Sequence, residues 1–304
     1  MSADRRLANP AASARDRLYN LAQQRGVEFQ LLLSEFAIER LLYRLASSSY
    51  RDLFILKGAM LFKLWDAASH RATWDLDLLG RGTNTIAAVV AVFKDLCGVT
   101  TPDGIVFDPF SVKGEEIKAE DEYAGVRVLL VARLAEARIP VQVDVGFGDA
   151  VVPDPTWQAY PTLLDHQPPR ILVYPREVVV AEKLEAMLKL GVTNSRMKDF
   201  YDVHILASKF SFEGPRLAKA VRATLGRRGT PIPKTTPLVL TPEFLSAPER
   251  QVQWRAFLRR GRLEASPDGA VLAERLQVFL EPVLGALLKG EAFDRSWQAG
   301  GPWK

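Results

Sequence analysis

Two aspartates, Asp75 and Asp77, stand two residues apart in the run Asp-Leu-Asp-Leu-Leu. This alternation is typical of a strand, on which residues i and i+2 face the same side. Two carboxylates held together repel each other unless a divalent cation lies between them. A Mg²⁺ or Mn²⁺ ion bound there could bridge triphosphate oxygens and activate a hydroxyl, which is the chemistry of phosphoryl or nucleotidyl transfer.

Lys57 and Gly58 supply groups that suit the anion in such a reaction. They follow the short apolar run 53–56, which predicts a buried strand, and precede the helical stretch 59–67. A strand that turns directly into a helix directs backbone N–H groups toward an anion. We expect Gly58 to let phosphates approach closely and Lys57 to neutralise them.

A third acid, Asp144, lies within the apolar run 141–145, where Val143 and Val145 should face the opposite side. A neighbouring strand in register would place Asp144 beside Asp75 and Asp77. We predict it as a third metal ligand or as the base that accepts the hydroxyl proton. The simpler alternative is a surface residue, and a D-x-D pair alone is common on the exposed face of an amphipathic strand.

A second group of charged residues lies on two expected helices further along the chain. Lys183 stands in the amphipathic run 178–187, and Lys198 begins a second helix with Asp199 and Asp202. The two acids are three residues apart and share a helix face. They could form structural salt bridges with the lysines, or they could bind the base, ribose or triphosphate of a nucleotide.

The composition is that of a globular protein with room for two domains: 304 residues, 48% hydrophobic and 25% charged. The single cysteine, Cys97, cannot form an internal disulfide, which fits a reducing compartment. The three histidines lack metal-ligand spacing, so zinc or haem is disfavoured and carboxylates must hold any metal. Without a signal peptide or a spanning segment, we expect a cytoplasmic protein with no membrane partner.

The order of elements predicts an α+β, bilobed protein with a mixed sheet core, N-terminal helices and a C-terminal helical domain. Residues 1–50 form a helical lead-in, 51–170 the α/β core, and 171–304 the helical domain. The expected strands are 53–56, 75–79, 105–107, 125–131 and 139–145. The expected helices are 10–25, 28–45, 59–67, 85–96 with Asn84 as cap, 175–190, 196–209, 215–225, 242–258 and 270–288.

Positive charge is concentrated toward the C-terminus. Residues 196–234 hold nine basic residues against three acidic ones, and residues 250–262 hold five arginines and no acid. Such segregation favours an RNA-facing surface. The alternative is ordinary solvated helix faces.

Four blocks together resemble a known family. They are Leu56-Lys57-Gly58-Ala59, Arg71-x-Thr73-x-Asp75-x-Asp77, Ala181-Glu182-Lys183-Leu184-x-Ala186-Met187, and Ser195-Arg196-Met197-Lys198-Asp199-Phe200-Tyr201-Asp202. Their order and spacing resemble the AbiEii/AbiGii-type nucleotidyltransferase toxins, which include MenT-like proteins and belong to the DNA polymerase β-like superfamily. The family usually reads Lys-Gly-Gly, and Ala59 stands here at the second glycine.

The resemblance implies roles for particular residues. Lys57, Asp75, Asp77, Lys183 and Asp202 would be catalytic, with Mg²⁺ (or Mn²⁺) on the strand acids. Nucleotide binding would involve Lys57, Gly58, Ala59, Lys183, Lys198 and Asp199, while Arg71 and Thr73 would support the metal strand.

The resemblance also implies a biological role and partners. Relatives are toxins of type IV toxin–antitoxin systems that transfer nucleotides, commonly pyrimidines, from an NTP to the 3′ end of tRNA and so block translation. A cognate antitoxin protein is implied as a partner. Two alternatives stay open: the same site could nucleotidylate or phosphorylate a protein, or the chain could be a non-catalytic module that binds nucleotide or antitoxin.

Overall fold

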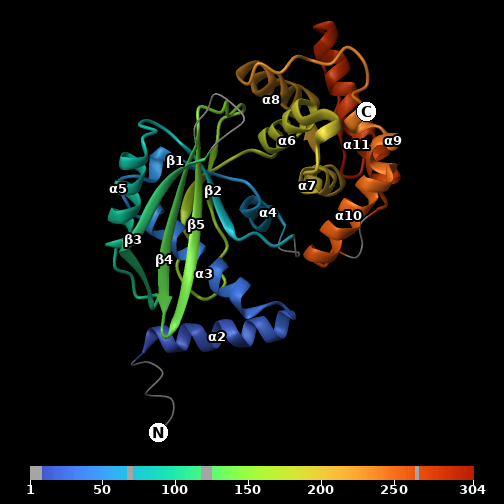
Figure 1. Ribbon diagram of the computed structural model, residues 1–304. Helices are drawn as coiled ribbons and strands as arrows, with labels where there is room; N and C mark the ends of the chain where they lie inside the picture. Colours follow the sequence, from blue (N-terminus) through green and yellow to red (C-terminus); the bar gives the residue numbers. More distant parts are fainter. Residues whose placement is uncertain (1–8, 67–70, 118–124, 264–266) are drawn as a thin grey trace. The chain divides into compact units, whose positions relative to one another are not determined.

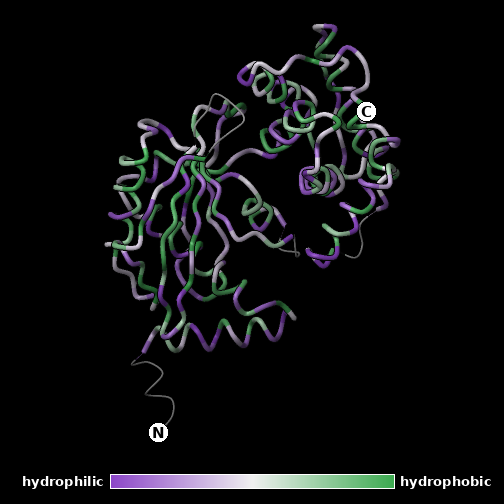
Figure 2. The backbone as a smooth tube through the Cα atoms, in the orientation of Figure 1, coloured by the Kyte–Doolittle hydropathy of each residue, from purple (hydrophilic) through white to green (hydrophobic). Residues whose placement is uncertain are grey.

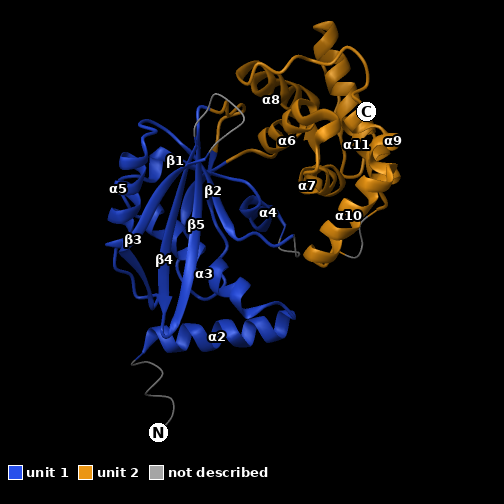
Figure 3. Ribbon diagram, in the orientation of Figure 1, with its two compact units in different colours: residues 1–148, 156–173 blue, residues 149–155, 174–304 orange. Residues whose placement is uncertain are grey.

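The computed structural model describes residues 9–66, 71–117, 125–263 and 267–304 (Figure 1). The chain divides into two compact units (Figure 3). Unit 1 comprises residues 1–148 and 156–173, and unit 2 comprises residues 149–155 and 174–304. The N-terminal helices belong to unit 1 together with the sheet, and the segment 149–155 belongs to unit 2.

Unit 1 is built on a seven-stranded mixed sheet with the order β3-β4-β5-β2-β1-β7-β6. Strand β1 pairs antiparallel with β2 and parallel with β7, while β2 pairs parallel with β5. This sheet confirms the predicted α+β class with a mixed core. The strands are β1 (Phe54–Lys57), β2 (Asp75–Gly80), β3 (Ile105–Ile117), β4 (Gly125–Leu134), β5 (Ala137–Phe147), β6 (Thr156–Ala159) and β7 (Arg170–Val173).

The helices of unit 1 form where the sequence predicts them, with ends set by their caps. The Asn9 side chain accepts from the Ala12 N–H at the start of the first helix, and Gly26 ends that helix with φ 63°. Hydrophobic and hydrophilic residues are interleaved along both the strands and this helix (Figure 2). The helices are α2 (Pro10–Arg25), α3 (Phe29–Ala46), α4 (Met60–Trp65) and α5 (Ile86–Cys97), with a 3-10 turn at Arg51–Leu53.

Helix α3 is buried along most of its length and carries charge into the core of unit 1. Arg40 and Arg44 donate to Asp103 at 2.9 and 2.8 Å, so these buried charges are paired. The neighbouring Glu39 accepts from the Leu163 N–H at 2.7 Å. Burial nevertheless raises the pKa of Glu39 to about 7, against the opposing effects of that N–H and of Arg40.

Unit 2 is helical, with a two-stranded β8–β9 sheet. Its aromatic core stacks Phe279 against Trp303 at 5.7 Å, and the Trp297 indole donates to the Ala207 carbonyl at 2.7 Å. These contacts fix the C-terminal segment on the helices. The elements are α6 (Arg176–Leu190), α7 (Met197–Lys209), β8 (Phe212–Glu213), α8 (Gly214–Arg227), α9 (Pro242–Ser246), α10 (Pro248–Gly261), α11 (Gly269–Lys289) and β9 (Ser296–Trp297), with 3-10 turns at Gly191–Thr193 and Leu238–Leu240.

Three predicted elements are corrected. Residues after 170 were expected to be helical throughout, but β7 pairs with β1 and completes the sheet. The helix 242–258 is two helices, because Pro248 lacks an N–H and disfavours helical geometry at Ala247, where α9 ends. Thr85, not Asn84, caps α5 by accepting from the Ala88 N–H.

None of the helices in the described part of the chain combines the length and apolarity needed to cross a membrane.

Candidate functional site

A row of charged residues crosses the middle of the sheet in unit 1. In register, Lys57 on β1 lies opposite Asp77 on β2, and Asp77 lies opposite Asp144 on β5. Residues opposite each other on neighbouring strands have side chains on the same face. The predicted alignment of Asp144 with the D-x-D strand is therefore confirmed.

Asp75 and Asp77 share the more accessible face of β2. Both are half-buried, whereas Leu76 and Leu78 between and beyond them are 1% exposed. The Thr73 hydroxyl lies 3.5 Å from the Asp75 carbonyl oxygen, and the supporting role of Thr73 stays a prediction. The pleat thus separates a core face of leucines from a polar face that holds two carboxylates.

Gly58 lies against the carboxylate of Asp77. Its φ is +73°, and a Cβ added to it would overlap Asp77 Oδ2 and lie 2.7 Å from Asp77 Cγ. Only glycine permits both this conformation and this approach. Ala59, at the second glycine position of the family pattern, has φ −70° and is 6% exposed, so alanine fits its backbone and packs in the core.

Asp144 is held by a residue that the sequence analysis did not identify. Arg127 on β4 donates from Nε and Nη2 to the two Asp144 oxygens, both at 2.8 Å, and its guanidinium lies 3.9 Å from Glu115. The Gln142 amide donates to the same carboxylate at 3.2 and 3.3 Å. The hydrogen bond to Asp144 raises the pKa of Arg127 above its ordinary value.

The signal for Arg127 was present in the sequence but needed the turn to be located. Strands β4 and β5 are joined by residues 135–136, with Leu134 opposite Ala137. Counting seven residues back and seven forward from that pair places Arg127 opposite Asp144. Without the turn position, the register of the hairpin was open.

The donor set suits a magnesium ion with two protein carboxylates. Across residues 9–66, 71–117, 125–263 and 267–304, no group of three or more His, Cys, Asp or Glu side chains could hold a metal ion. Both oxygens of Asp144 accept from Arg127, and the carboxylates of Asp75 and Asp77 supply hard oxygen donors on β2. Because Mg²⁺ is commonly held by one or two carboxylates plus substrate phosphates, this pair fits it. The role of Asp144 as third ligand stays a prediction.

The second predicted group is an ion cluster within unit 2. The Lys183 ammonium on α6 lies 2.8 Å from Asp199 Oδ1 and 2.7 Å from Asp202 Oδ2 on α7. The two aspartate side chains are 1% and 0% exposed, and that of Lys183 is 14% exposed. Arg196 adds a second cation, with its Nε 2.6 Å from Asp199 Oδ2.

The charges in this cluster compensate one another. Burial opposes the charged form of Asp199, but the attraction of Lys183 and Arg196 outweighs it and holds the pKa of Asp199 below its usual value. Lys198, in the first turn of α7, is exposed. The cluster joins α6 to α7 as the salt-bridge interpretation proposed, and the nucleotide-binding roles of these residues stay predictions.

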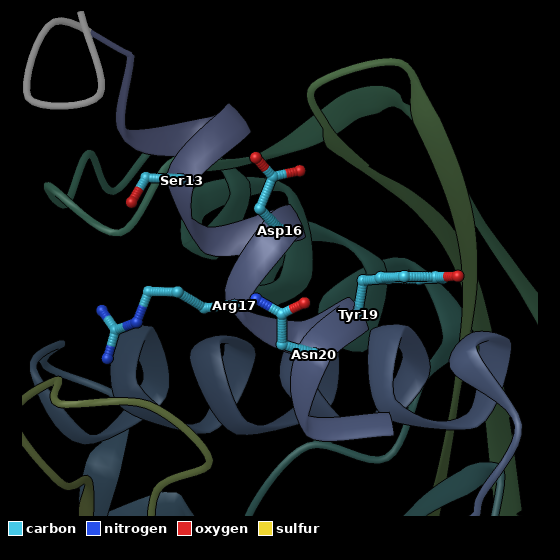
Figure 4. Close-up of a pocket in the computed structure, with 5 residues that line it drawn as sticks. All are labelled: Ser13, Asp16, Arg17, Tyr19 and Asn20. Atoms are coloured by element: carbon cyan, nitrogen blue, oxygen red, sulfur yellow. The ribbon is translucent and has the colours of Figure 1, made fainter. Parts of the chain in front are cut away.

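A pocket on α2 lies apart from the predicted site residues. It is lined by Ser13, Asp16, Arg17, Tyr19 and Asn20 (Figure 4). The Arg17 guanidinium is already paired with Asp165 at 2.6 Å. The pocket contains none of the residues that the sequence singled out.

Comparison with known proteins establishes the class and then the family. The class is a nucleotidyltransferase: the family model described as "Nucleotidyl transferase AbiEii toxin, Type IV TA system" matches residues 40–289. The chain belongs to this AbiEii family of type IV toxin–antitoxin systems, as the four sequence blocks indicated. Membership implies a nucleotide substrate and an antitoxin partner.

Two solved Helicobacter pylori structures share partial similarity. JHP933 has 18% identity and a TM-score of 0.48 over 86% of this chain and 95% of its own. A second protein, solved as a candidate nucleotidyltransferase, has the same identity and TM-score over 87% of this chain and 99% of its own. No curated protein matches the chain significantly.

Proposed function

We propose that the chain transfers a nucleoside monophosphate from an NTP to the 3′-hydroxyl of an RNA. The acceptor is tRNA and the donor a pyrimidine NTP, as the family resemblance implies. The observation that carries the proposal is the row on the sheet: Lys57 opposite Asp77, with Gly58 packed directly on the Asp77 carboxylate. This arrangement joins an anion-binding turn to the strand that carries two carboxylates.

The proposed reaction is a displacement at the α-phosphorus of the NTP. The RNA 3′-oxygen forms a bond to the α-phosphorus, and the bond from that phosphorus to the oxygen bridging to the β-phosphate breaks. Pyrophosphate leaves with that oxygen, and the hydroxyl proton passes to a carboxylate of the row. The product is an RNA longer by one nucleotide, whose blocked 3′ end no longer accepts an amino acid.

The residues of unit 1 have distinct tasks in this step. Asp75 and Asp77 would hold Mg²⁺, which would supply positive charge near the triphosphate and lower the pKa of the attacking hydroxyl. Lys57 neutralises phosphate charge next to the acids, and Gly58 leaves room for the phosphates. Arg127 holds Asp144, which limits repulsion among three neighbouring carboxylates.

Unit 2 contributes through α6 and α7 in this proposal. Lys183 and Asp202 complete the catalytic set as the resemblance implies, and Asp199 and Lys198 bind nucleotide. The supporting observation is that Lys183 holds the two buried aspartates within 2.8 Å, which fixes the first turns of α7 against α6. The exposed Lys198 lies in that first turn.

The direct test supplies each NTP, labelled at the α-phosphate, together with either total tRNA or a cell lysate freed of RNA. We expect label in the tRNA fraction, with CTP or UTP as the best donor. Label in protein would replace the RNA acceptor with a protein acceptor. No label in either fraction, with NTP binding intact, would favour a non-catalytic module.

A matched variant isolates the proposed site. Asp77→Asn keeps the size of the side chain but removes the charge that holds a metal ion. We expect it to abolish transfer and growth arrest while the far-UV circular dichroism stays that of the wild type. A folded Asp77→Asn protein that still labels tRNA would overturn the assignment.

A further inference from the structure

Helix α10 carries a surface that the proposed chemistry does not use. Residues 250–262 contain five arginines and no acidic residue. The single fully buried side chain of the helix is Trp254, which is 2% exposed. The helix therefore covers unit 2 with one edge, and its exposed residues after Arg250 are Val252, Arg255, Arg259 and Arg260.

The helical period separates the buried edge from the charged one. Trp254 and Phe257 are three residues apart and stack on each other at 5.6 Å. Arg255 and Arg259 are four residues apart, so they form one row, about 6 Å apart along the axis, on the side away from this pair. Arg260, the next residue along the helix, lies beside this row.

These three arginines differ from the ion-paired cations Arg216 and Arg228 of unit 2. Arg255, Arg259 and Arg260 are exposed, and within the described part of the chain they form no ion pair with a carboxylate. By contrast, Arg216 on α8 lies 3.1 Å from Glu177, and Arg228 lies 2.7 Å from Glu185. The α10 row is thus positive charge that the fold does not neutralise.

A rigid contact links this surface to the helix that carries the second group of site residues. Tyr201, next to Asp202 on α7, packs against Phe257 at 5.6 Å and Trp254 at 6.4 Å. Arg250 ties the start of α10 to the 3-10 turn Gly191–Thr193, which lies between α6 and α7, by donating to the Val192 carbonyl at 2.5 Å. The charged face is therefore held on a fixed platform one helix away from Lys183.

We infer that Arg255, Arg259 and Arg260 on α10 form the docking surface for the sugar–phosphate backbone of the RNA acceptor, which rests on the proposed function. A row made only of arginine suits phosphates, because a guanidinium binds two phosphate oxygens at once and stays charged. Two guanidinium groups four residues apart, with a third beside them, can contact several phosphates of one polymer. Unneutralised exposed charge supplies the salt-dependent part of RNA binding.

The test compares two double charge reversals in the full chain. Arg255→Glu with Arg259→Glu removes the row, and Lys219→Glu with Arg222→Glu makes the same charge change on exposed positions of α8. Binding of a labelled RNA hairpin with a single-stranded 3′ end is measured by fluorescence anisotropy over a range of salt, without NTP. Thermal melting confirms that both variants are folded.

We expect the α10 variant to bind at least tenfold more weakly, and the slope of log affinity against log salt to become shallower by about one to two units. The α8 variant should stay within about threefold of the wild type. An unchanged α10 variant, or equal losses in both variants, would overturn the inference. Competition by polyglutamate as strong as by RNA would also overturn it, because the surface would then accept any acidic polymer.

The result is separable from that of the proposed function. Asp77→Asn should bind the hairpin like the wild type, because β2 lies outside the docking surface. Loss of RNA binding in the α10 variant together with transfer by Asp77→Asn would reject the catalytic assignment alone. Intact RNA binding in the α10 variant together with loss of transfer in Asp77→Asn would reject the docking surface alone.

Discussion

Asp75 and Asp77 in unit 1 and Asp199 and Asp202 in unit 2 look similar in the sequence, yet the fold treats them differently. The strand pair is half-buried, beside a glycine and opposite Lys57. The helix pair is buried and held by Lys183 within 2.8 Å. Carboxylates on the accessible face of a strand can take a metal ion, whereas buried ones need a cation from the protein itself.

The comparison separates carboxylates that we expect to act in the reaction from carboxylates that stabilise the fold. Partners inside the protein stabilise the helix pair at all times, so removal of a partner should affect folding first. The strand pair is arranged for a ligand, so its removal should affect activity first. The four predictions below test this division.

The largest expected effect is the loss of nucleotide transfer in the Asp77→Asn variant. Loss of the carboxylate should lower the rate on the order of a thousandfold, because it removes charge that stabilises the transition state. The far-UV circular dichroism should stay that of the wild type, because Asn keeps the size of the side chain. Asp144→Asn is the matched comparison, and a smaller loss of transfer is expected because Asp144 is bound to Arg127.

Equal losses of transfer in Asp77→Asn and Asp144→Asn would contradict the different roles assigned to these two aspartates. They would show that Asp144 acts directly, as a third ligand or as the base. Quench-flow or gel-based measurement of labelled RNA gives both rates.

Lys183→Met should mainly destabilise the protein. It removes the cation that lies 2.8 Å from Asp199 and 2.7 Å from Asp202, two buried carboxylates, which costs about 3–5 kcal/mol. Chemical denaturation measures this loss. Adding Asp199→Asn and Asp202→Asn should restore most of the stability, because the buried charges are then gone.

The restored triple variant also tests the catalytic role of Lys183. We expect its transfer rate to stay low despite the recovered fold, because Lys183 and Asp202, which the family resemblance places in the active site, are both missing. Recovery of transfer to near the wild-type rate would limit Lys183 to support.

Gly58→Ala should weaken both activity and stability. A Cβ would overlap the Asp77 carboxylate in a backbone with φ +73°, so that carboxylate must move. We expect a loss of transfer of about a hundredfold and a destabilisation of about 1–3 kcal/mol. Ala59→Gly, at an ordinary φ of −70°, should change transfer by less than about threefold. A fully active Gly58→Ala protein would show that the close approach is unimportant.

The smallest expected effect is the pH dependence of stability. The lowered pKa of Asp199 gives stability above its unfolded pKa that is lost as pH falls through the lower folded pKa, in the acid range. The raised pKa of Glu39 acts oppositely: stability is lost as pH rises from about 4.5 to 7. Glu39→Gln should therefore stabilise the protein by up to roughly 3 kcal/mol at pH 8 and hardly at pH 4.5. Denaturation curves showing the same difference at both pH values would contradict the Glu39 assignment.

The sequence predicted local features of the fold better than distant pairings. The Lys-Gly turn and the D-x-D strand follow from side-chain period and turn residues, and the structure has them at Lys57, Gly58, Asp75 and Asp77. The strand β7 was missed because its four residues follow a proline-rich segment and gain stability only by pairing with β1. Short strands of this kind depend on partners that are remote in the sequence.

The sequence predicted which residue types form the candidate site, but not which of these residues bind each other. Asp144 was expected among the metal ligands, yet its binding to Arg127 depends on the register of a hairpin. Lys183, Asp199 and Asp202 were grouped from helical spacing, but their nearly complete burial depends on tertiary packing. Residue type and spacing identify candidate ligands, and packing decides which of them are already occupied.

The most direct test of the central claim is a crystal structure of the protein with Mn²⁺ and a non-hydrolysable NTP, with the metal located by anomalous scattering. We predict an anomalous peak within bonding distance of both the Asp75 and Asp77 carboxylates and of the triphosphate, with Asp144 still bound to Arg127. A bound nucleotide whose metal ion contacts neither strand aspartate would contradict the account.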